Sequence, residues 1–407
     1  MIHEIRDSRF GLMGHLAIDR AVDGRACGGI RWGPGVTQEE LQALAYDMSL
    51  KFGFSNIRLG GAKSGIIAPF ELDPSERKER LEAFGRALAP FLRSGAYIPG
   101  ADLGTSHEDA LTVCEAAGFK RPDTHHGEMA GYYTGYGVVQ AVLMSLRHLG
   151  LKESDCSVAI EGFGKVGGAI GRLLADLGIR VAAISTKQGG RYHPRGLDIH
   201  QLILNQQSHP ETWIEQYRDG DPIHSSDLYE LPVDILIPCA GPWMIHESNW
   251  KKIWAKAIVP GANIPARRNI QEQLEGRGVL YLPDFLCNSG GVLANTFEWR
   301  GFSGREIERF LQEIFSAKIK KTLNEAKRKG KSVSILAEEG ALQNLEKMEK
   351  AVQKSRAERW PGKLVKAVCH PRRAVRYLAS AYYRRALPLR QLVAKEAWEE
   401  AVTAFNN

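Results

Sequence analysis

The chain has 407 residues, of which 43% are hydrophobic and 25% charged, the proportions of an ordinary globular protein. This length suits two domains and an additional segment. No apolar run approaches the roughly 20 residues that cross a bilayer, and the first residues lack the apolar centre of a signal peptide, so we expect a cytoplasmic protein.

The formal net charge of +7 is distributed unevenly along the chain. Residues 353–407 carry 12 Lys and Arg against 4 Asp and Glu, whereas the remainder sums to −1. The basic character therefore belongs to the C-terminal tail. Such a tail can contact nucleic acid, anionic lipid or an acidic partner, or pack within the protein's own oligomer, and its sequence does not choose among these partners.

The six cysteines are scattered and form no CxxC pair. This argues against a zinc site and a disulfide framework and favours buried free thiols. His125 and His126 are adjacent in a predicted loop, but no third ligand stands at a metal-binding spacing. We therefore interpret them as surface histidines and expect no metal site.

Near the N-terminus, strands are predicted at residues 12–18 and 26–30, and Asp23-Gly24 between them indicates a hairpin. Residues 37–40 (Thr-Gln-Glu-Glu) form a capping box that opens a helix with apolar positions at helical spacing. Lys51 falls near the end of this helix on its inner face. From spacing alone, an exposed lysine at a helix end remains the simpler interpretation.

A glycine-rich loop is predicted at residues 59–65 (Leu-Gly-Gly-Ala-Lys-Ser-Gly), followed by a strand at 66–69. Among small neighbours Lys63 loses hydration, which lowers the pKa of its amine toward a range useful for proton transfer. The alternative is a solvated lysine in a turn. Lys51, and Asp102 in the loop that follows a strand at 97–98, favour the catalytic interpretation.

The strongest local pattern lies at residues 157–185. A buried strand at 157–161 leads into Gly162-Phe163-Gly164-Lys165-Val166-Gly167, a helix over 168–177 and a strand at 181–185. This is the GxGxxG pattern in the strand–turn–helix context that it requires. The glycines allow a tight turn, close approach of a pyrophosphate and packing of helix on strand, while helix amides bind the anion. We predict a dinucleotide-binding site.

The second strand of this unit ends in Ile184-Ser185-Thr186-Lys187, without the carboxylate that usually binds the ribose 2′-hydroxyl. Arg191 and Arg195 follow nearby. Hydroxyl and cationic groups suit a 2′-phosphate better than a hydroxyl. We therefore expect NADP to be accepted at least as well as NAD.

Three further strands are predicted at residues 233–238, 257–259 and 280–282, each followed by small or polar residues. The carboxyl ends of parallel strands face the ligand crevice, which places Cys239, Ala240, Asn263 and Asn288 there. Asparagines are also common in simple turns. Residues 306–353 predict charged helices that return over the first domain, and Trp360-Pro361-Gly362 predicts a break before a basic amphipathic stretch.

Taken together, these motifs resemble the glutamate/leucine/phenylalanine/valine dehydrogenase family over about residues 25–350. The resemblance rests on motifs that follow one another in the family's order: Gly28-Gly29-Ile30-Arg31, the Lys51 to Lys63 spacing, Gly60-Gly61-Ala62-Lys63, Asp102-Leu103-Gly104, Thr134-Gly135-Tyr136-Gly137, the dinucleotide pattern, Ile237-Pro238-Cys239-Ala240, Gly261-Ala262-Asn263 and Asn288-Ser289-Gly290-Gly291-Val292.

The resemblance implies an α/β protein of two domains with a cleft between them, and a homo-oligomer. We expect an N-terminal α/β substrate domain at 1–130, a Rossmann NAD(P)-binding domain at 131–303, a helical return at 304–352 and a basic helical extension at 353–407.

The resemblance also implies reversible oxidative deamination of an L-amino acid to a 2-oxo acid and ammonia. Lys51 would hold the substrate α-carboxylate, Lys63 would be the general base acting through water, and Asp102 would shuttle the amino-group proton. Thr134, Asn263 and Asn288 would orient nicotinamide and substrate. Other motif residues complete the expected substrate-binding set: Cys27, Gly28, Gly29, Val292 and Asn295.

Departures from the family pattern bear on the substrate. Cys27 stands where glutamate-specific members carry a lysine for the side-chain carboxylate, which favours an uncharged side chain such as that of leucine, valine or phenylalanine. Asn295 makes the expected pocket mixed in polarity, and Pro260 replaces a usual glutamate. The alternatives are a glutamate dehydrogenase and a degenerate member that acts as a binding or regulatory protein. A hydroxy-acid dehydrogenase is disfavoured because its expected His–acid pair is missing.

Overall fold

The structure is a computed structural model that describes residues 1–119, 129–210, 212–298 and 301–369. The predictions for His125, His126 and the basic stretch beyond residue 369 lie outside these residues. None of the described helices combines the length and apolar character that a membrane span requires.

The N-terminal domain contains a five-stranded sheet in the order β1-β2-β4-β3-β5. Its strands are β1 (Ile2–Asp7), β2 (Leu12–Ile18), β3 (Ala26–Trp32), β4 (Gly60–Ile66) and β5 (Tyr97–Ala101). β4 runs parallel to β3 and antiparallel to β2. The expected hairpin is therefore wrong. Both strands exist, but β4 lies between them, and around Asp23-Gly24 only the isolated bridge from Val22 to Arg25 forms.

Residues 60–66 also correct the prediction of a loop at Lys63 and a strand at 66–69. They form the buried strand β4, with Lys63 at its centre. A Cβ at Gly61 would lie 2.1 Å from the carbonyl oxygen of Ala45 in α1, so glycine lets the helix and strand backbones approach closely. The glycines indicated a loop by composition, whereas here they serve close packing inside a sheet.

Helices cover both faces of this sheet. α1 (Gln38–Phe54) packs on one face with a small core of Ala17, Val36, Leu41 and Ala45. α2 (Pro74–Arg93) and α3 (His107–Ala116) share the larger core on the other face with Leu16, Ile30 and Phe84. Because strand residues alternate between faces, Lys63 lies on the same side of β4 as Gly61, the side that α1 covers.

The second domain contains a seven-stranded sheet in the order β12-β11-β10-β6-β7-β8-β9. The parallel strands are β6 (Ser157–Glu161), β7 (Arg180–Thr186), β10 (Ile235–Pro238), β11 (Ala257–Ile258) and β12 (Leu280–Tyr281), which confirms the predicted strands. Two antiparallel strands that extend this sheet, β8 (Gly189–Tyr192) and β9 (Asp221–Ile223), were not predicted from the sequence. This is the Rossmann-like arrangement that the GxGxxG pattern indicated.

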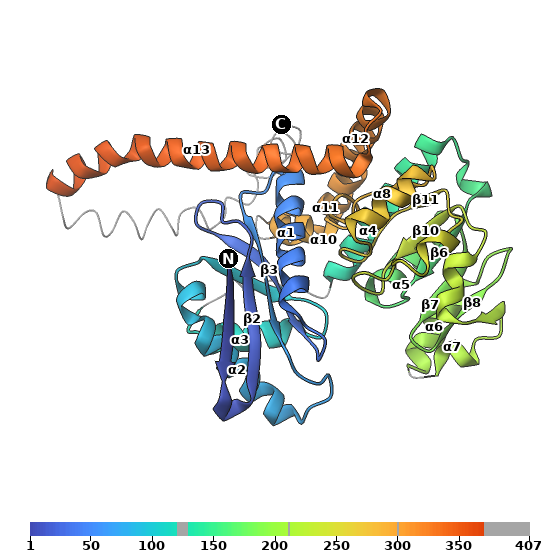
Figure 1. Cartoon of the computed structure of the whole chain (residues 1–407), viewed down its shortest axis with the longest axis horizontal. Helices are drawn as coiled ribbons and strands as arrows, with labels where there is room; N and C mark the ends of the chain where they lie inside the picture. The colour runs from blue at the N-terminus through green and yellow to red at the C-terminus, as the bar shows by residue number, and fades with distance from the viewer. Residues whose placement is uncertain (120–128, 211, 299–300, 370–407) are drawn as a thin grey trace.

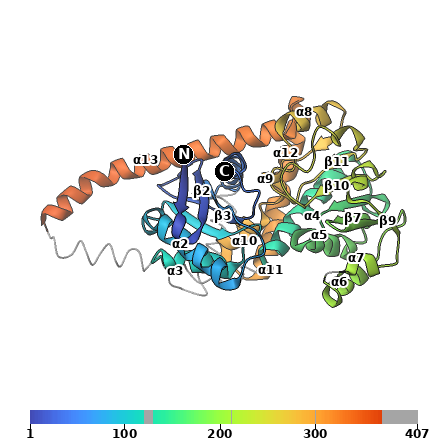
Figure 2. The same cartoon turned by 60° about the horizontal axis from the view of Figure 1, so that its bottom comes forward.

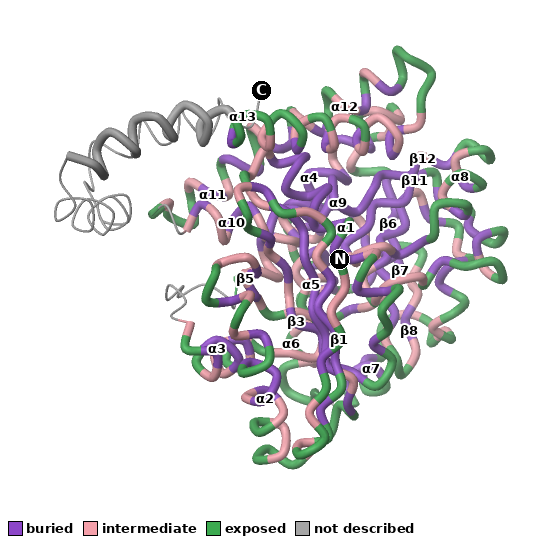
Figure 3. Tube along the Cα trace, turned by 60° about the vertical axis from the view of Figure 1, so that its left-hand side comes forward, coloured by how far each residue is buried: buried purple, intermediate pink, exposed green. Residues whose placement is uncertain are grey.

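α4 (Ala130–Leu149) and α5 (Lys165–Asp176) pack against one face of this sheet, and α8 (Arg268–Gly276) packs against the other. Figure 3 shows buried residues concentrated along the strands and α4. The smaller elements are η1 (Ser8–Phe10), η3 (Glu153–Asp155), α6 (Ile199–Ser208), α7 (Trp213–Gln216), η4 (Ser225–Glu230), η5 (Trp250–Lys252) and α9 (Asp284–Cys287).

The last helices connect the two domains. α10 (Gly290–Glu298) and α11 (Gly304–Phe310) lie between the two sheets (Figures 1 and 2). η6 (Leu311–Phe315) and α12 (Ser316–Lys329) follow, and α12 contacts α4 and α13. α13 (Val333–Cys369) then packs on α1, where Asn344 donates to the Gly53 carbonyl at 3.2 Å. The expected break at Trp360-Pro361-Gly362 is wrong, since α13 continues to Cys369.

Candidate active site

The N-terminal sheet brings Lys63 and Asp102 together. Nζ of Lys63 lies 2.9 Å from Oδ2 of Asp102, and Lys63 is only 2% exposed. Asp102 follows β5, which is separated from β4 by β3. A Cβ on Gly29 of β3 would lie 2.7 Å from the Asp102 Cβ, so the absence of a side chain at Gly29 makes room for the carboxyl group.

Arg31 of β3 is a second buried cation at this carboxylate. Its Nε donates to Oδ2 of Asp102 at 2.9 Å, and its Nη1 donates to Glu40 on α1. Lys63 and Arg31 therefore converge on the same oxygen of Asp102. Neither contact uses Oδ1 of Asp102.

The electrostatics of this group suit proton transfer. Burial lowers the pKa of Lys63, against the pull of Asp102, and the charges of Arg31 and Lys51 lower it further. Burial alone would raise the pKa of Asp102, but Lys63 and Arg31 outweigh it and hold that pKa below its usual range. The site thus combines a stable carboxylate with an amine that releases its proton readily.

Lys51 links the two domains. It lies near the C-terminal end of α1 and is 4% exposed, so the interpretation as an exposed helix-end lysine is wrong. Its Nζ donates to Oδ1 of Asn263 at 2.5 Å and lies 3.0 Å from Oδ2 of Asp47. Asn263 follows β11, and Asn288 donates to the same Oδ1 at 2.9 Å. The two predicted crevice asparagines are therefore in contact with each other and with Lys51.

The GxGxxG turn leaves room for an anion at the start of α5. Gly162 has a φ of 86°, and a Cβ there would lie 2.5 Å from the Ala240 nitrogen, so only glycine fits. Gly164 precedes α5, provides no side-chain cap, and a Cβ there would meet nothing within 4 Å. Open space thus faces the uncapped amides of the first turn, which Lys165, Val166 and Gly167 supply. This arrangement fits a pyrophosphate.

Phe163 differs from the other residues of this turn. Its ring packs 5.9 Å from Trp213, and its N–H donates to the Ser185 carbonyl at 2.9 Å. The ring and the N–H of Phe163 therefore already have partners inside the protein. The neighbouring amides of the turn are the groups expected to bind the anion.

The residues at the end of β7 and after it support a binding site for a 2′-phosphate only in part. Lys187 Nζ lies 5.7 Å from the Phe70 ring centroid, and the Thr186 hydroxyl bonds within its own turn. Arg191 is buried and donates to the carbonyls of Ile214 and Glu215, so it is not directed toward a ligand. Of the three cations that the sequence suggested here, Arg191 is removed, whereas Lys187 and Arg195 are exposed and remain candidates.

The other predicted residues come from both domains. Cys27 and Gly28 belong to β3, where Cys27 pairs with Gly61 of β4. Val292 and Asn295 lie on the partly exposed side of α10. The Thr134 hydroxyl donates to the Ala130 carbonyl within α4 at 2.8 Å, and Cys239 and Ala240 follow β10.

The sequence analysis assigned no role in the site to five polar residues that are buried in the structure: Arg31, Glu40, Asp47, Glu161 and Asp284. Asp47 had a usable signal, because it precedes Lys51 by one helical turn on the buried face of α1. Glu161 ends β6 and accepts the Ala240 N–H at 3.2 Å, and burial raises the pKa of its carboxyl to about 7. The partners of Arg31 are Asp102, after β5, and Glu40, on α1. These elements meet β3 only in the folded protein, so the sequence alone does not show the contacts.

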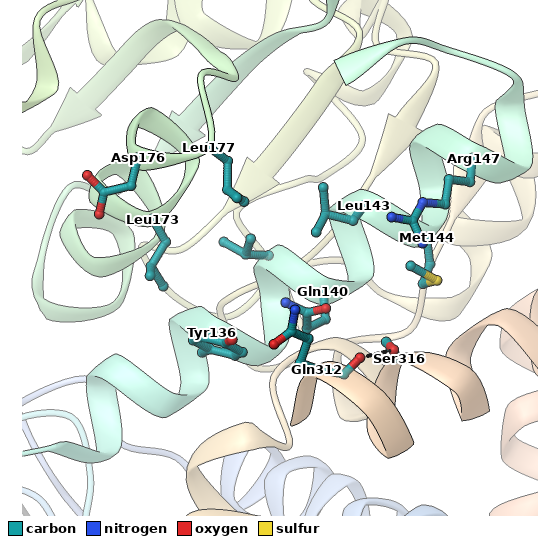
Figure 4. A pocket seen from close by; sticks show the side chains of 11 residues that line it. Tyr136, Gln140, Leu143, Met144, Arg147, Leu173, Asp176, Leu177, Gln312 and Ser316 are labelled. Atoms are coloured by element: carbon teal, nitrogen blue, oxygen red, sulfur yellow. Dashed lines mark hydrogen bonds between the residues drawn. The ribbon is translucent and has the colours of Figure 1, made fainter. Parts of the chain in front are cut away.

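A separate groove of about 310 Å³ lies between α4, α5 and the η6–α12 segment. Figure 4 shows its lining, with Tyr136, Leu143 and Leu173 among apolar and polar side chains. It contains none of the predicted site residues, so we do not assign the chemistry to it.

Comparison with protein families gives two matches. Residues 128–356 match the family model described as Glutamate/Leucine/Phenylalanine/Valine dehydrogenase, and residues 11–116 match that described as Glu/Leu/Phe/Val dehydrogenase, dimerisation domain. Among curated relatives, a glutamate dehydrogenase of Thermotoga maritima is 34% identical over 68% of this chain and 69% of its own length. An NAD-specific glutamate dehydrogenase of Staphylococcus aureus is 32% identical over 75% and 77%.

Solved structures share the fold. A hetero-hexameric glutamate dehydrogenase from Thermus thermophilus, in its Leu-bound form, matches with a TM-score of 0.75 and 23% identity over 86% of this chain and 89% of that chain. An L-tryptophan dehydrogenase from Nostoc punctiforme matches with a TM-score of 0.61 and 20% identity over 86% and 96%. These likenesses establish the two-domain architecture.

Proposed function

Since the chain belongs to the glutamate/leucine/phenylalanine/valine dehydrogenase family, we propose that it catalyses the reversible NAD(P)-dependent oxidative deamination of an L-amino acid to a 2-oxo acid and ammonia. The observation that carries the proposal is the buried contact of 2.9 Å between Lys63 and Asp102. A binding protein would have no need to bury such a pair together with Lys51.

Each side chain has a distinct task in this reaction. Lys51 binds the substrate α-carboxylate, which fixes the position of the α-carbon. Oδ1 of Asp102 accepts a hydrogen bond from the amino group. NAD(P)⁺, which the GxGxxG turn would hold, would supply the hydride acceptor for the α-carbon. As positive charge develops on the imino nitrogen, the carboxylate of Asp102 stabilises it.

Hydrolysis of the iminium then needs a base. Lys63 in its neutral form takes a proton from a water molecule as the oxygen bonds to the imino carbon. Burial lowers the pKa of Lys63, which favours this neutral form. Lys63 passes this proton through Asp102 to the amino group, which makes that group able to leave as ammonia. Lys63, neutral again, then takes the hydroxyl proton as the C–N bond breaks and later releases it to solvent. Collapse of the carbinolamine releases ammonia and the 2-oxo acid.

We propose an uncharged side chain for the substrate. Cys27, partly exposed on β3, offers no cation to a side-chain carboxylate. The named curated relatives are glutamate dehydrogenases, which makes glutamate the alternative substrate. A degenerate member that only binds ligands is a further alternative, disfavoured because Lys51, Lys63 and Asp102 are all present.

A panel of L-amino acids, assayed with NAD⁺ and with NADP⁺ by the absorbance of the reduced nicotinamide, tests these proposals. We expect the highest kcat/KM for leucine, valine or phenylalanine. A higher kcat/KM for glutamate would contradict the substrate proposal, and no turnover with any amino acid would contradict the enzyme proposal. Lys78→Ala, which removes an exposed lysine of α2, is the matched control for variants of Lys51 and Lys63.

For the cofactor, we propose that NADP is used at least as well as NAD. Lys187 follows β7 without a competing carboxylate in residues 184–187. Lys187→Ala should then lower kcat/KM for NADP⁺ more than for NAD⁺. An equal loss for both, or a strong preference of the unmodified enzyme for NAD⁺, would contradict the proposal.

We also propose a homo-oligomer, since residues 11–116 match a dimerisation domain. Light scattering of the full chain tests this, and a monomeric mass would contradict it.

A further inference from the structure

Two adjacent arginines at the start of α8 reach from the Rossmann domain to neighbouring helices. Nη1 of Arg267 donates to Oε1 of Glu39, in the first turn of α1, at 2.7 Å. Nη1 of Arg268 donates to Oε2 of Glu338 on α13 at 2.7 Å. The other oxygen of Glu338 accepts the hydroxyl of Tyr46 on α1 at 2.5 Å. Both arginines therefore connect α8 to α1, one directly and one through α13.

These contacts lie close in sequence to the bond between Lys51 and Asn263. Glu39 and Lys51 belong to the same helix, α1. On the other side, Arg267 follows Asn263 by four residues. The segments that carry the two bonded side chains are thus the segments that the arginines join.

The turn at residues 261–264 is fixed within the Rossmann domain. Asn288, the residue after α9, donates to two backbone carbonyls of this turn at 3.2 and 3.3 Å. Asp284, the first residue of α9, accepts the N–H of the last residue of the turn at 2.7 Å. Asn263 therefore moves with its domain, and its distance from Lys51 depends on how that domain rests on α1.

Trp243 supports this arrangement from the loop after β10. The guanidinium carbon of Arg267 lies 4.4 Å from the centroid of the Trp243 ring. The N–H of Trp243 donates to the carbonyl of Ile264 at 2.9 Å. Because a cation is attracted to the face of an aromatic ring, Trp243 restricts the Arg267 side chain while it also bonds to the turn.

We propose that Arg267 and Arg268 form a docking pair that holds the turn of Asn263 against α1 and so aligns Asn263 with Lys51. The proposal rests on the proposed function, in which Lys51 binds the substrate carboxylate, and adds the residues that position it. The docking pair touches neither Lys51 nor the GxGxxG turn in the described contacts, so its members are positioning residues. Loss of alignment weakens substrate binding even when every binding group is still present.

Steady-state kinetics of Arg267→Gln, Arg268→Gln and the double variant test the docking pair. An exposed ion pair contributes a factor of up to about five. We expect KM for the preferred amino acid to rise about threefold in each single variant and about tenfold in the double variant, with kcat within about twofold. Lys252→Gln is the matched control, because it breaks an exposed ion pair with Glu230 inside the Rossmann domain and should leave KM unchanged. An unchanged KM in the double variant would overturn the proposal.

Glu39→Gln separates docking from general electrostatics. Removal of this negative charge would by itself favour an anionic substrate and lower KM, whereas loss of docking raises it. We expect KM to rise as in Arg267→Gln, and the variant with both changes to have the KM of either one alone, because the two side chains act through one contact. A lower KM in Glu39→Gln, or effects of the two changes that multiply, would overturn the proposal.

Hydrogen exchange of the full chain without substrate gives a readout that does not depend on turnover. With both arginines replaced by glutamine, amides in residues 38–47 and 261–270 should exchange faster than in wild type, while those of β6 keep their rate. Unchanged exchange in both segments would overturn the docking contact. If exchange increases but no amino acid is turned over by wild type, the proposed function fails and the docking contact stands.

Discussion

The two buried lysines lie in differently balanced surroundings. The Lys63 cluster comprises Lys63, Arg31, Asp102 and Glu40, so two cations meet two carboxylates, all from the N-terminal domain. The Lys51 cluster comprises Lys51, Asp47, Asn263 and Asp284, in which one cation meets two carboxyls drawn from both domains. The first cluster is complete within one domain, whereas the second depends on how the domains meet.

This contrast separates reaction chemistry from substrate placement. Changes in the Lys63 cluster should act mainly on kcat. Changes in the Lys51 cluster should act mainly on KM.

The largest effect is expected for Asp102→Asn. It removes the negative charge to which we assign stabilisation of the iminium, and it leaves Lys63 and Arg31 without their shared acceptor charge. We expect kcat to fall by roughly a thousandfold, within the range of general acid–base contributions. Steady-state kinetics with the preferred amino acid measures this, and cofactor binding serves as the control for folding. A kcat within about fivefold of wild type would show that Asp102 is not part of the chemistry.

Lys51→Gln should act on substrate binding instead. It removes a charge-assisted hydrogen bond to the substrate carboxylate, so KM should rise roughly 10-fold to 100-fold, while kcat changes less. The same kinetics measure both constants. If kcat fell as strongly as for Asp102→Asn while KM stayed unchanged, the division of labour between the two clusters would be wrong.

Arg31→Gln tests whether the charge of Arg31 lowers the pKa of Lys63 in the Lys63 cluster. The charge of Arg31 lowers the pKa of both Lys63 and Asp102, so its removal raises both. The rise of kcat with pH, which follows loss of the proton from Lys63, should then shift to higher pH. The variant also leaves Glu40 buried without its partner, which should cost about 3–5 kcal/mol of stability.

The double variant Arg31→Gln with Glu40→Gln removes both charges and is the matched control. It should recover much of the stability lost in the single variant but keep the shifted pH profile. An unshifted profile in both variants would mean that Arg31 does not act on Lys63.

The smallest effect is expected for deletion of residues 354–407. The described contacts of α13 with α1 come from its first part, including Asn344, and the deletion keeps both clusters. We expect kcat and KM to stay within about twofold of wild type. A large change in either would show that the basic tail takes part in the site.

The sequence correctly predicted the elements whose formation is determined by residues adjacent in the chain. The GxGxxG turn, with its strand and helix, is one continuous stretch whose requirements are local. The three glycines around Lys63 predict a loop, whereas the pairing of β4 between β2 and β3, with α1 packed on it, makes Lys63 a strand residue. Local composition could not show that packing, since it depends on elements distant in the chain.

The polar partners were harder to predict for the same reason. Arg31 meets Glu40 and Asp102 only because β3 lies between β4 and β5 with α1 above the sheet. Asp284 meets Asp47 only when the two domains pack together. The roles of Lys51, Lys63 and Asp102 came from the resemblance to a family, and their proximity is what the structure adds.

The most direct test of the account is the turnover of Lys63→Ala with the preferred amino acid, with and without methylamine. The account predicts that turnover falls by roughly a thousandfold or more and that cofactor binding persists. It also predicts that turnover returns in proportion to the concentration of the neutral amine, which replaces the missing base. A variant that turns over as fast as wild type without added amine would contradict the assignment of Lys63 as the base.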